Sequence, residues 1–179
     1  MPVPMKEMIS DAFLDLINRR SIDKVTVKDL VDACGISRQT FYYHFKDILE
    51  VIDWTIDRQC DRILSESLKK STPAEAIGVY VDVMIKNRES LRRGLESSKH
   101  DYIHKALYRS LQGYLQALFR SRRAVADINL VTEQLALQFC AGGMAGILLT
   151  HCQTQSFDRD AIVQELAAFL KAIGDIHSR

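Results

Sequence analysis

The side chains best suited to chemistry lie between residues 37 and 46, a stretch that holds basic but no acidic residues. Such a stretch can approach phosphate groups without charge repulsion. Arginine can bridge two acceptors of guanine, glutamine can pair with adenine, and a threonine methyl suits thymine. Side chains of these three types follow one another as Arg38, Gln39 and Thr40. The residues suited to backbone phosphates come next, as Tyr42, Tyr43, His44 and Lys46.

Two short helices joined by a tight turn are predicted to position these side chains. Thr26 opens a Thr-x-x-Asp capping pattern, and Gly35 stands where a helix commonly ends in a left-handed residue. Ser37 can cap the second helix, whose opposite face carries Phe41 and Phe45 for packing against the first helix. Two helices in this arrangement form a helix-turn-helix, whose second helix lies in the major groove of DNA.

The rest of the sequence predicts more helices and no strand. Only 8 Gly and 3 Pro occur in 179 residues, which is too few for the many tight turns of a β-sandwich. Apolar residues recur every three or four positions in most segments, as expected of amphipathic helices. We expect an all-α fold of about nine helices, at roughly 5–19, 27–34, 38–45, 48–69, 74–87, 88–95, 100–121, 128–152 and 158–177.

Composition divides the chain into a helix-turn-helix domain at 1–47 and a larger helical bundle at 48–179. The formal net charge is only +1, so any basic surface must be local. The sequence shows neither a signal peptide nor an apolar run of the length that a membrane span needs. Its 4 cysteines form no CxxC pair. A protein of the cytoplasm with reduced thiols and no membrane partner is therefore expected.

The segment from Thr26 to Asp47 resembles the N-terminal domain of the TetR (tetracycline-repressor) family. The match rests on TVxDLVxxCGISRQTFYYHFKD, in which Gly-Ile-Ser precedes a polar triplet and Phe-Tyr-x-x-Phe. The resemblance implies a dimeric transcription regulator that binds a palindromic DNA operator and responds to a small effector. Family members commonly carry a phosphate-binding Lys where this chain has Ile48, which leaves Lys46 as the substitute nearby. The sequence also resembles the subgroup that contains activators of dihydroxyacetone kinase operons.

Three glycines close together in a predicted helix, Gly142, Gly143 and Gly146, need a physical reason. Glycine inside a helix costs about 1 kcal/mol relative to alanine, so a close approach between helices is the expected compensation. That approach lies either within one subunit or across a two-fold dimer seam. The resemblance favours the dimer, formed together with the last helix through Leu166, Phe169 and Leu170.

Other patterns give weaker indications. His100 and His104 have the spacing of a metal pair but lack an evident third ligand, so solvated histidines are the simpler interpretation. By the resemblance, aromatic and apolar residues between 54 and 123 could line an effector cavity, although most are expected to be core. The residues concerned are Trp54, Tyr80, Met84, Tyr102, Tyr108 and Phe119, and none receives a specific role.

The sequence thus predicts a sequence-specific DNA-binding transcription regulator. The residues expected at the DNA are Thr26, Ser37, Arg38, Gln39, Thr40, Tyr42, Tyr43, His44 and Lys46. No phosphate loop, nucleophile elbow, metal signature or cofactor fingerprint appears, so we expect neither an enzyme nor a bound cofactor. The alternative is a helical dimer that binds protein or non-specific nucleic acid.

Overall fold

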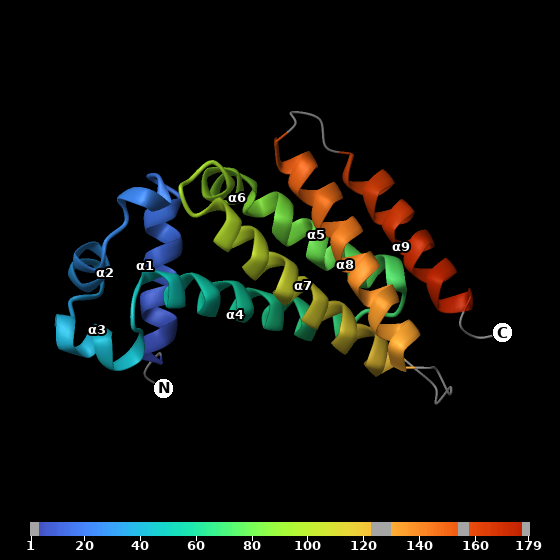
Figure 1. Ribbon diagram of the computed structural model, residues 1–179, viewed down its shortest axis with the longest axis horizontal. Coiled ribbons are helices and arrows are strands. Elements are labelled where there is room, and N and C mark those ends of the chain that lie inside the picture. Colours follow the sequence, from blue (N-terminus) through green and yellow to red (C-terminus); the bar gives the residue numbers. More distant parts are fainter. Residues whose placement is uncertain (1–3, 123–129, 154–157, 177–179) are drawn as a thin grey trace. The chain divides into compact units, whose positions relative to one another are not determined.

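The computed structural model describes residues 4–122, 130–153 and 158–176, and within these ranges every regular element is helical. The α-helices are α1 (Met5–Ile17), α2 (Val27–Cys34), α3 (Arg38–His44), α4 (Ile48–Leu68), α5 (Pro73–Lys86), α6 (Arg88–Leu95), α7 (His100–Arg122), α8 (Leu130–Gln153) and α9 (Arg159–Ile176) (Figure 1). The all-α prediction is confirmed, with helix ends within a few residues of those expected. Predicted helical positions 128, 129 and 177 lie outside the described residues.

Local capping explains several helix boundaries. At α5 the Thr72 hydroxyl accepts a hydrogen bond from the Glu75 amide (3.2 Å), and the Glu75 carboxylate accepts one from the Thr72 amide (3.0 Å). Pro73 occupies the first turn of this helix, where its missing N–H costs nothing. The 3-10 helix η1 (Ile22–Lys24) was not predicted, and it begins where the Ser21 hydroxyl accepts from the Asp23 amide.

The chain forms two compact units, each made of segments that are separate in sequence. The first comprises Met1–Arg58 and Glu89–Ala106, and the second comprises Gln59–Arg88 and Leu107–Arg179. Helices α4 and α7 each contribute residues to both units. The division after residue 47, expected from composition, remains a prediction about the extent of the DNA-binding domain.

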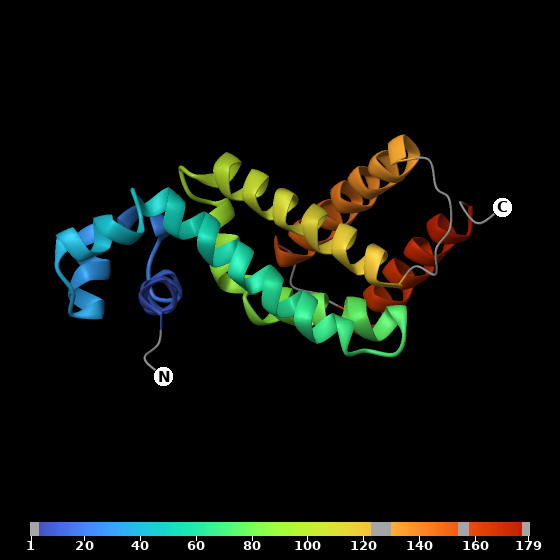
Figure 2. The same ribbon diagram turned by 90° about the horizontal axis from the view of Figure 1, so that it is seen from below.

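The first unit has a small apolar core built from three helices and the start of α4. Viewed from below, α1 is seen along its axis with α2 and α3 together on one side (Figure 2). Its most buried side chains are Ile9, Phe13, Leu30, Phe41, Phe45 and Val51. Two buried hydroxyls satisfy each other, because Thr55 donates to Ser10 at 3.0 Å. The unit therefore holds its short helices by side-chain packing.

Residues from α6 to the start of α7 belong to this unit through polar contacts. The Asp23 carboxylate accepts hydrogen bonds from the Ser98 amide (3.0 Å), the Ser98 hydroxyl (2.7 Å) and the Lys99 ammonium (3.0 Å). These contacts, led by the Ser98 hydroxyl, lower the pKa of Asp23 to about 2. Arg93 also donates to the Asn18 carbonyl at 3.0 Å. A segment distant in sequence is thus bound to the end of α1 and to η1.

The second unit is a bundle in which α5 packs against α9 and α8. The rings of Tyr80 and Tyr114 lie 5.2 Å apart in its interior, and the buried Ser67 hydroxyl donates to the Ala76 carbonyl at 3.0 Å. At the surface, Arg159 of α9 forms a two-point contact with Asp82 of α5 at 2.5 and 2.9 Å. No helix in the described part of the chain is both long and apolar enough to cross a membrane.

Candidate nucleic-acid interface

The turn between α2 and α3 has the geometry that the sequence predicts. The Thr26 hydroxyl accepts from the Asp29 amide at 3.2 Å, and the Asp29 carboxylate accepts from the Thr26 amide at 2.8 Å. This reciprocal cap starts α2, which ends at Gly35 with φ 64° and ψ 33°. In this left-handed conformation a Cβ atom would be strained, so glycine allows the chain to reverse toward α3.

Two buried phenylalanines fix the rotation of α3 about its own axis, Phe41 within the helix and Phe45 directly after it. The Ser37 hydroxyl caps its start by accepting from the Thr40 amide at 3.0 Å. The rings of Phe41 and Phe45 are buried with centroids 6.1 Å apart, and the Phe45 ring also meets the edge of Trp54 at 6.1 Å. Because this face is committed to the core, the remaining side chains of α3 must point outward.

Six of the nine residues that were predicted to bind DNA lie on α3 itself, while Ser37 caps its start, Lys46 follows its C-cap and Thr26 caps α2. Tyr43 is 85% exposed and Tyr42 is 56% exposed, which is unusual for side chains of this size. The exposed polar residues of the predicted set are Thr26, Ser37, Arg38, Gln39 and Lys46, and the half-buried ones are Thr40 and His44. The hydroxyls of Ser37 and Thr40 lie 2.9 Å apart, so Thr40 has its methyl group left for an apolar contact.

The cations beside α3 lack counter-charges within the described residues. Neither Arg38 nor Lys46 forms an ion pair there. The nearby acids at the start of α4 bind backbone amides instead: Asp47 accepts from the Glu50 amide at 3.0 Å, and Glu50 accepts from the Lys46 amide at 2.6 Å. These carboxylates favourably oppose the dipole of α4 and leave the two cationic side chains available.

Other cations of the same unit are neutralised by partners. Arg20 contacts Asp29 at 2.8 Å, and the hydrogen bonds that Asp29 receives, from Thr26 and then from Arg20, lower its pKa to about 2. Hydrogen bonds from Arg92 and Arg93 likewise lower the pKa of Glu89 to about 2. Available positive charge is therefore distributed unevenly over the unit, and α3 is one of the places that retain it.

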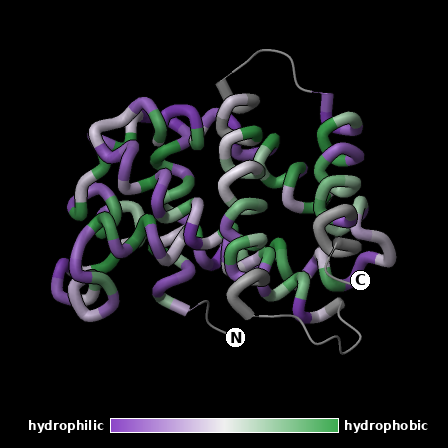
Figure 3. The backbone as a smooth tube through the Cα atoms, turned by 45° about the vertical axis from the view of Figure 1, so that its right-hand side comes forward, coloured by the Kyte–Doolittle hydropathy of each residue, from purple (hydrophilic) through white to green (hydrophobic). Residues whose placement is uncertain are grey.

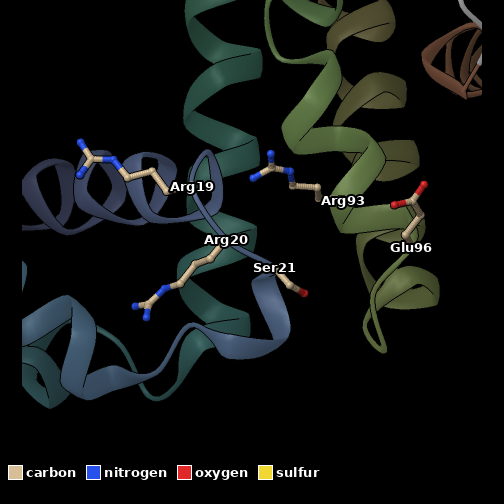
Figure 4. Close-up of a pocket in the computed structure, with 5 residues that line it drawn as sticks. All are labelled: Arg19, Arg20, Ser21, Arg93 and Glu96. Atoms are coloured by element: carbon tan, nitrogen blue, oxygen red, sulfur yellow. The ribbon is translucent and has the colours of Figure 1, made fainter.

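A pocket of about 400 Å³ lies where the end of α1 meets α6 (Figure 4). Its lining residues are Arg19, Arg20, Ser21, Arg93 and Glu96. The guanidinium groups of Arg19 and Arg20 extend away from Arg93 and do not converge on one point (Figure 4). Arg93 already donates to the Asn18 carbonyl, and Glu96 is paired with Arg92 at 2.7 Å. We assign no ligand to this pocket.

Among the described residues the two histidines form no metal site, and the effector cavity stays a prediction. His100 contacts the Ser97 carbonyl at 3.2 Å and Asp101 at 3.3 Å, and no group of three metal-ligating residues occurs among the described residues. Of the aromatic residues considered for an effector cavity, Tyr80 is buried against Tyr114, and Tyr108 donates to the Gln138 carbonyl at 3.3 Å.

The second unit presents an apolar outer surface on α8 and α9, which we call the α8–α9 outer face. It consists of Leu135, Phe139, Ile147 and Phe169, all exposed. Phe139 is 65% and Phe169 is 43% exposed, and their rings lie 6.0 Å apart. Apolar segments occur along both helices (Figure 3). This surface was missed in the sequence except for Phe169, because α8 carries apolar residues on all sides and its pattern does not distinguish inside from outside.

The remaining predicted dimer residues divide into two groups. Leu166 and Leu170 are buried within the single chain, so their side chains already have packing partners. At Gly143 and Gly146 an added Cβ would meet nothing within 4 Å, and at Gly142 it would contact only the Tyr108 ring at 3.9 Å. The described part of the chain therefore supplies no close helix approach that explains Gly143 and Gly146.

Comparison with known proteins identifies the N-terminal segment. Residues 9–53 match the model of the family described as bacterial regulatory proteins, tetR family. A curated relative, the HTH-type dhaKLM operon transcriptional activator DhaS of Lactococcus lactis, is 26% identical over 62 residues. The match covers 35% of this chain and 33% of the relative, so the chain spans about a third of that protein in sequence.

Solved structures extend the likeness to the whole fold. The dihydroxyacetone kinase operon activator DhaS has a TM-score of 0.71 at 15% identity, covering 96% of this chain and 97% of that chain. The TetR family repressor AlkX of Dietzia sp. has a TM-score of 0.59 at 16% identity, covering 94% and 96%. A TetR-family regulator of Syntrophomonas wolfei reaches 0.67 at 14% identity, covering 94% and 93%. Because the sequence identities are this low, these structures show a shared fold and nothing more specific.

Proposed function

We propose that this chain, whose residues 9–53 match the model of the tetR family of bacterial regulatory proteins, belongs to that family and regulates transcription by binding a specific DNA sequence. The observation that carries the proposal is the outer side of α3. It combines exposed aromatic and polar side chains with cations that have no counter-charge among the described residues. A helix of this kind suits the major groove of a polyanionic duplex.

The side chains of α3 divide between two tasks in this proposal. Arg38, Gln39 and Thr40 occupy its first turn and read base edges, with each good bidentate pair discriminating by about 1–3 kcal/mol. Phosphates are bound by the residues Thr26, Ser37, Tyr42, Tyr43, His44 and Lys46. The buried Phe41 and Phe45 set the rotation of α3, and so determine which side chains reach the groove.

We also propose that the protein acts as a homodimer joined through the α8–α9 outer face. An exposed cluster that includes two aromatic residues is costly in water unless a partner covers it. The open space at Gly143 and Gly146 allows a second copy of α8 to approach closely. Two-fold symmetry places two α3 helices in half-sites a whole number of helical turns apart, so the operator is expected to be palindromic.

Control by a small effector completes the proposal and is drawn from the family. An effector would act by binding one dimer geometry more tightly than another, which changes the population able to bind DNA. Helices α4 and α7 each run through both compact units, so they are the elements that would carry such a change. Among the similar proteins one is named an activator and another a repressor, and our proposal covers both directions.

Selection of bound duplexes from a random pool tests this function most directly. The expected outcome is one enriched palindrome that is bound more tightly than random DNA, with affinity that falls as salt rises. Enrichment without a consensus would instead support a non-specific nucleic-acid binder. Failure to retain any duplex at low salt would support a helical protein-interaction module and contradict our proposal.

A further inference from the structure

We propose that Lys6, in the first turn of α1, is a second phosphate-binding cation of the DNA interface. The idea rests on the proposed function and adds a residue to it. The Lys6 ammonium lies 5.0 Å from the centroid of the Phe45 ring. Phe45 is the C-cap residue directly after α3, and Lys46 follows it. The start of α1 accordingly lies beside the end of α3 (Figure 1).

The acidic neighbours of Lys6 are bound elsewhere. Glu7 and Asp11, on the same helix, contact Arg58 at 2.8 and 2.6 Å. At the start of α4, Asp47 and Glu50 accept hydrogen bonds from backbone amides. Lys6 consequently has no ion pair among the described residues. Its charge remains available for an anion outside the protein.

The Phe45 ring gives this charge a defined position. An aromatic face attracts an ammonium group through its quadrupole, but it supplies no counter-charge. Phe45 is itself buried between Phe41 and Trp54, so the surface on which the ammonium rests is rigid. A cation held in this way loses less side-chain freedom when it binds a phosphate than an unrestrained lysine would.

A second cation, the exposed Lys46, follows α3 and Phe45 directly in the chain. Lys6 and Lys46 flank the end of α3 from two different elements, α1 and the loop before α4. We infer that together they bind backbone phosphates beside the end of α3.

Salt dependence separates this role from a structural one. Each phosphate neutralised by a cation contributes about 0.9 to the slope of log K against log salt, so Lys6→Gln should lower the slope by about one per subunit. Lys6→Arg should retain the wild-type slope. The matched control is Lys24→Gln, an exposed lysine without an ion pair among the described residues, located beyond the far end of α1. It should leave the slope unchanged.

The assay uses the full chain and the palindrome enriched by selection, with thermal melting of each variant as a folding check. If Lys6 only stabilises Phe45, Lys6→Gln lowers the melting temperature and leaves the slope intact, which overturns the inference. An equal decrease of the salt slope in Lys24→Gln would also overturn the inference. The slope would then depend on the total charge of the protein and not on the position of Lys6. If the wild type prefers no duplex, the proposed function fails before Lys6 is tested.

A second measurement covers the case in which Lys6→Gln does not fold. Single phosphates of the duplex are replaced by uncharged methylphosphonates, and wild type is compared with Lys6→Met, which keeps an apolar stem over the ring. At the phosphate that Lys6 contacts in each half-site, the methylphosphonate should weaken duplex binding by the wild type. The same replacement should not weaken binding by Lys6→Met. Parallel losses at every phosphate would contradict a direct contact.

Discussion

Helices α3 and α8 both expose aromatic residues, but their outer sides differ in chemistry. On α3 the exposed Tyr42 and Tyr43 stand among cations and hydrogen-bonding groups. On α8 the exposed side chains are those of Leu135, Phe139 and Ile147, on a helix that also carries open glycines. The hydroxyl of a tyrosine and the charge of a lysine remain favourable in water, whereas a phenylalanine ring gains by leaving it.

The contrast is consistent with the two different partners that we propose for the two helices. A polar, cationic side fits a hydrated polyanion, whose binding weakens as salt rises. An apolar side with open glycines fits a second protein surface that stays in place. Substitutions that remove these properties should change stability, dimerisation or duplex binding, and the expected changes in free energy differ in size.

The largest effect is expected at the buried side of α3. Phe45→Ala removes a ring packed on Phe41 and Trp54, and should lower the free energy of unfolding by about 3–5 kcal/mol. Tyr43→Ala, at 85% exposure, is the matched aromatic control and should change stability by less than about 0.5 kcal/mol while weakening duplex binding. Urea unfolding followed by circular dichroism measures both. Equal destabilisation would show that the outer side of α3 is also packed.

The next effect concerns the outer side of α8. Phe139→Glu places a charge in the apolar surface and should weaken dimerisation by about 2 kcal/mol or more, as expected of a central aromatic contact. Gly146→Leu should also yield monomers, because its side chain fills the space left open there. Sedimentation velocity gives the oligomeric state, with Ile85→Glu on α5 as a control. A dimer that survives both changes would place the interface elsewhere.

A smaller effect is expected for base recognition by α3. Arg38→Ala should weaken operator binding by about 1–3 kcal/mol and relax the preference at one base pair. Lys46→Ala should weaken all duplexes alike and flatten the salt dependence. Anisotropy titrations with singly substituted duplexes over a range of salt distinguish these outcomes. Binding equal to wild type by both variants at every salt concentration would refute the assignment.

The smallest expected effects come from glycines, with opposite signs in the two regions. Gly35→Ala should cost about 1 kcal/mol because φ is 64° there, although nothing lies within 4 Å of an added Cβ. Gly143→Ala should stabilise an isolated subunit by up to about 1 kcal/mol, since the residue is helical and its surroundings are open. Thermal melting of each variant measures these changes.

The proposed dimer allows a further check on the Gly143 result. Gly143→Ala should stabilise a monomeric Phe139→Glu variant but destabilise the dimer. This result would indicate that the second copy occupies the space beside Gly143. A gain of the same size in both backgrounds would contradict a close approach of two α8 helices.

The sequence was informative wherever the structure depends on residues close together in the chain. Caps and turns are of this kind: Thr26 with Asp29, the left-handed Gly35 and the Ser37 cap all involve positions within a few residues. The periodicity of apolar residues likewise follows from the helix itself. For that reason the helices, the turn and the outward-facing residues of α3 could be predicted.

Contacts between distant residues were decided by the tertiary structure alone. Leu166 and Leu170 have the composition of an interface, yet they are buried inside their own chain, while Phe139 is exposed. Nothing local indicates that Lys6 lies over Phe45, or that Arg58 neutralises the acids beside it. The sequence determined which helices form and which residue types they offer. The packing determined which side of each helix is covered, and which charges remain unpaired, because both depend on partners that are far away along the chain.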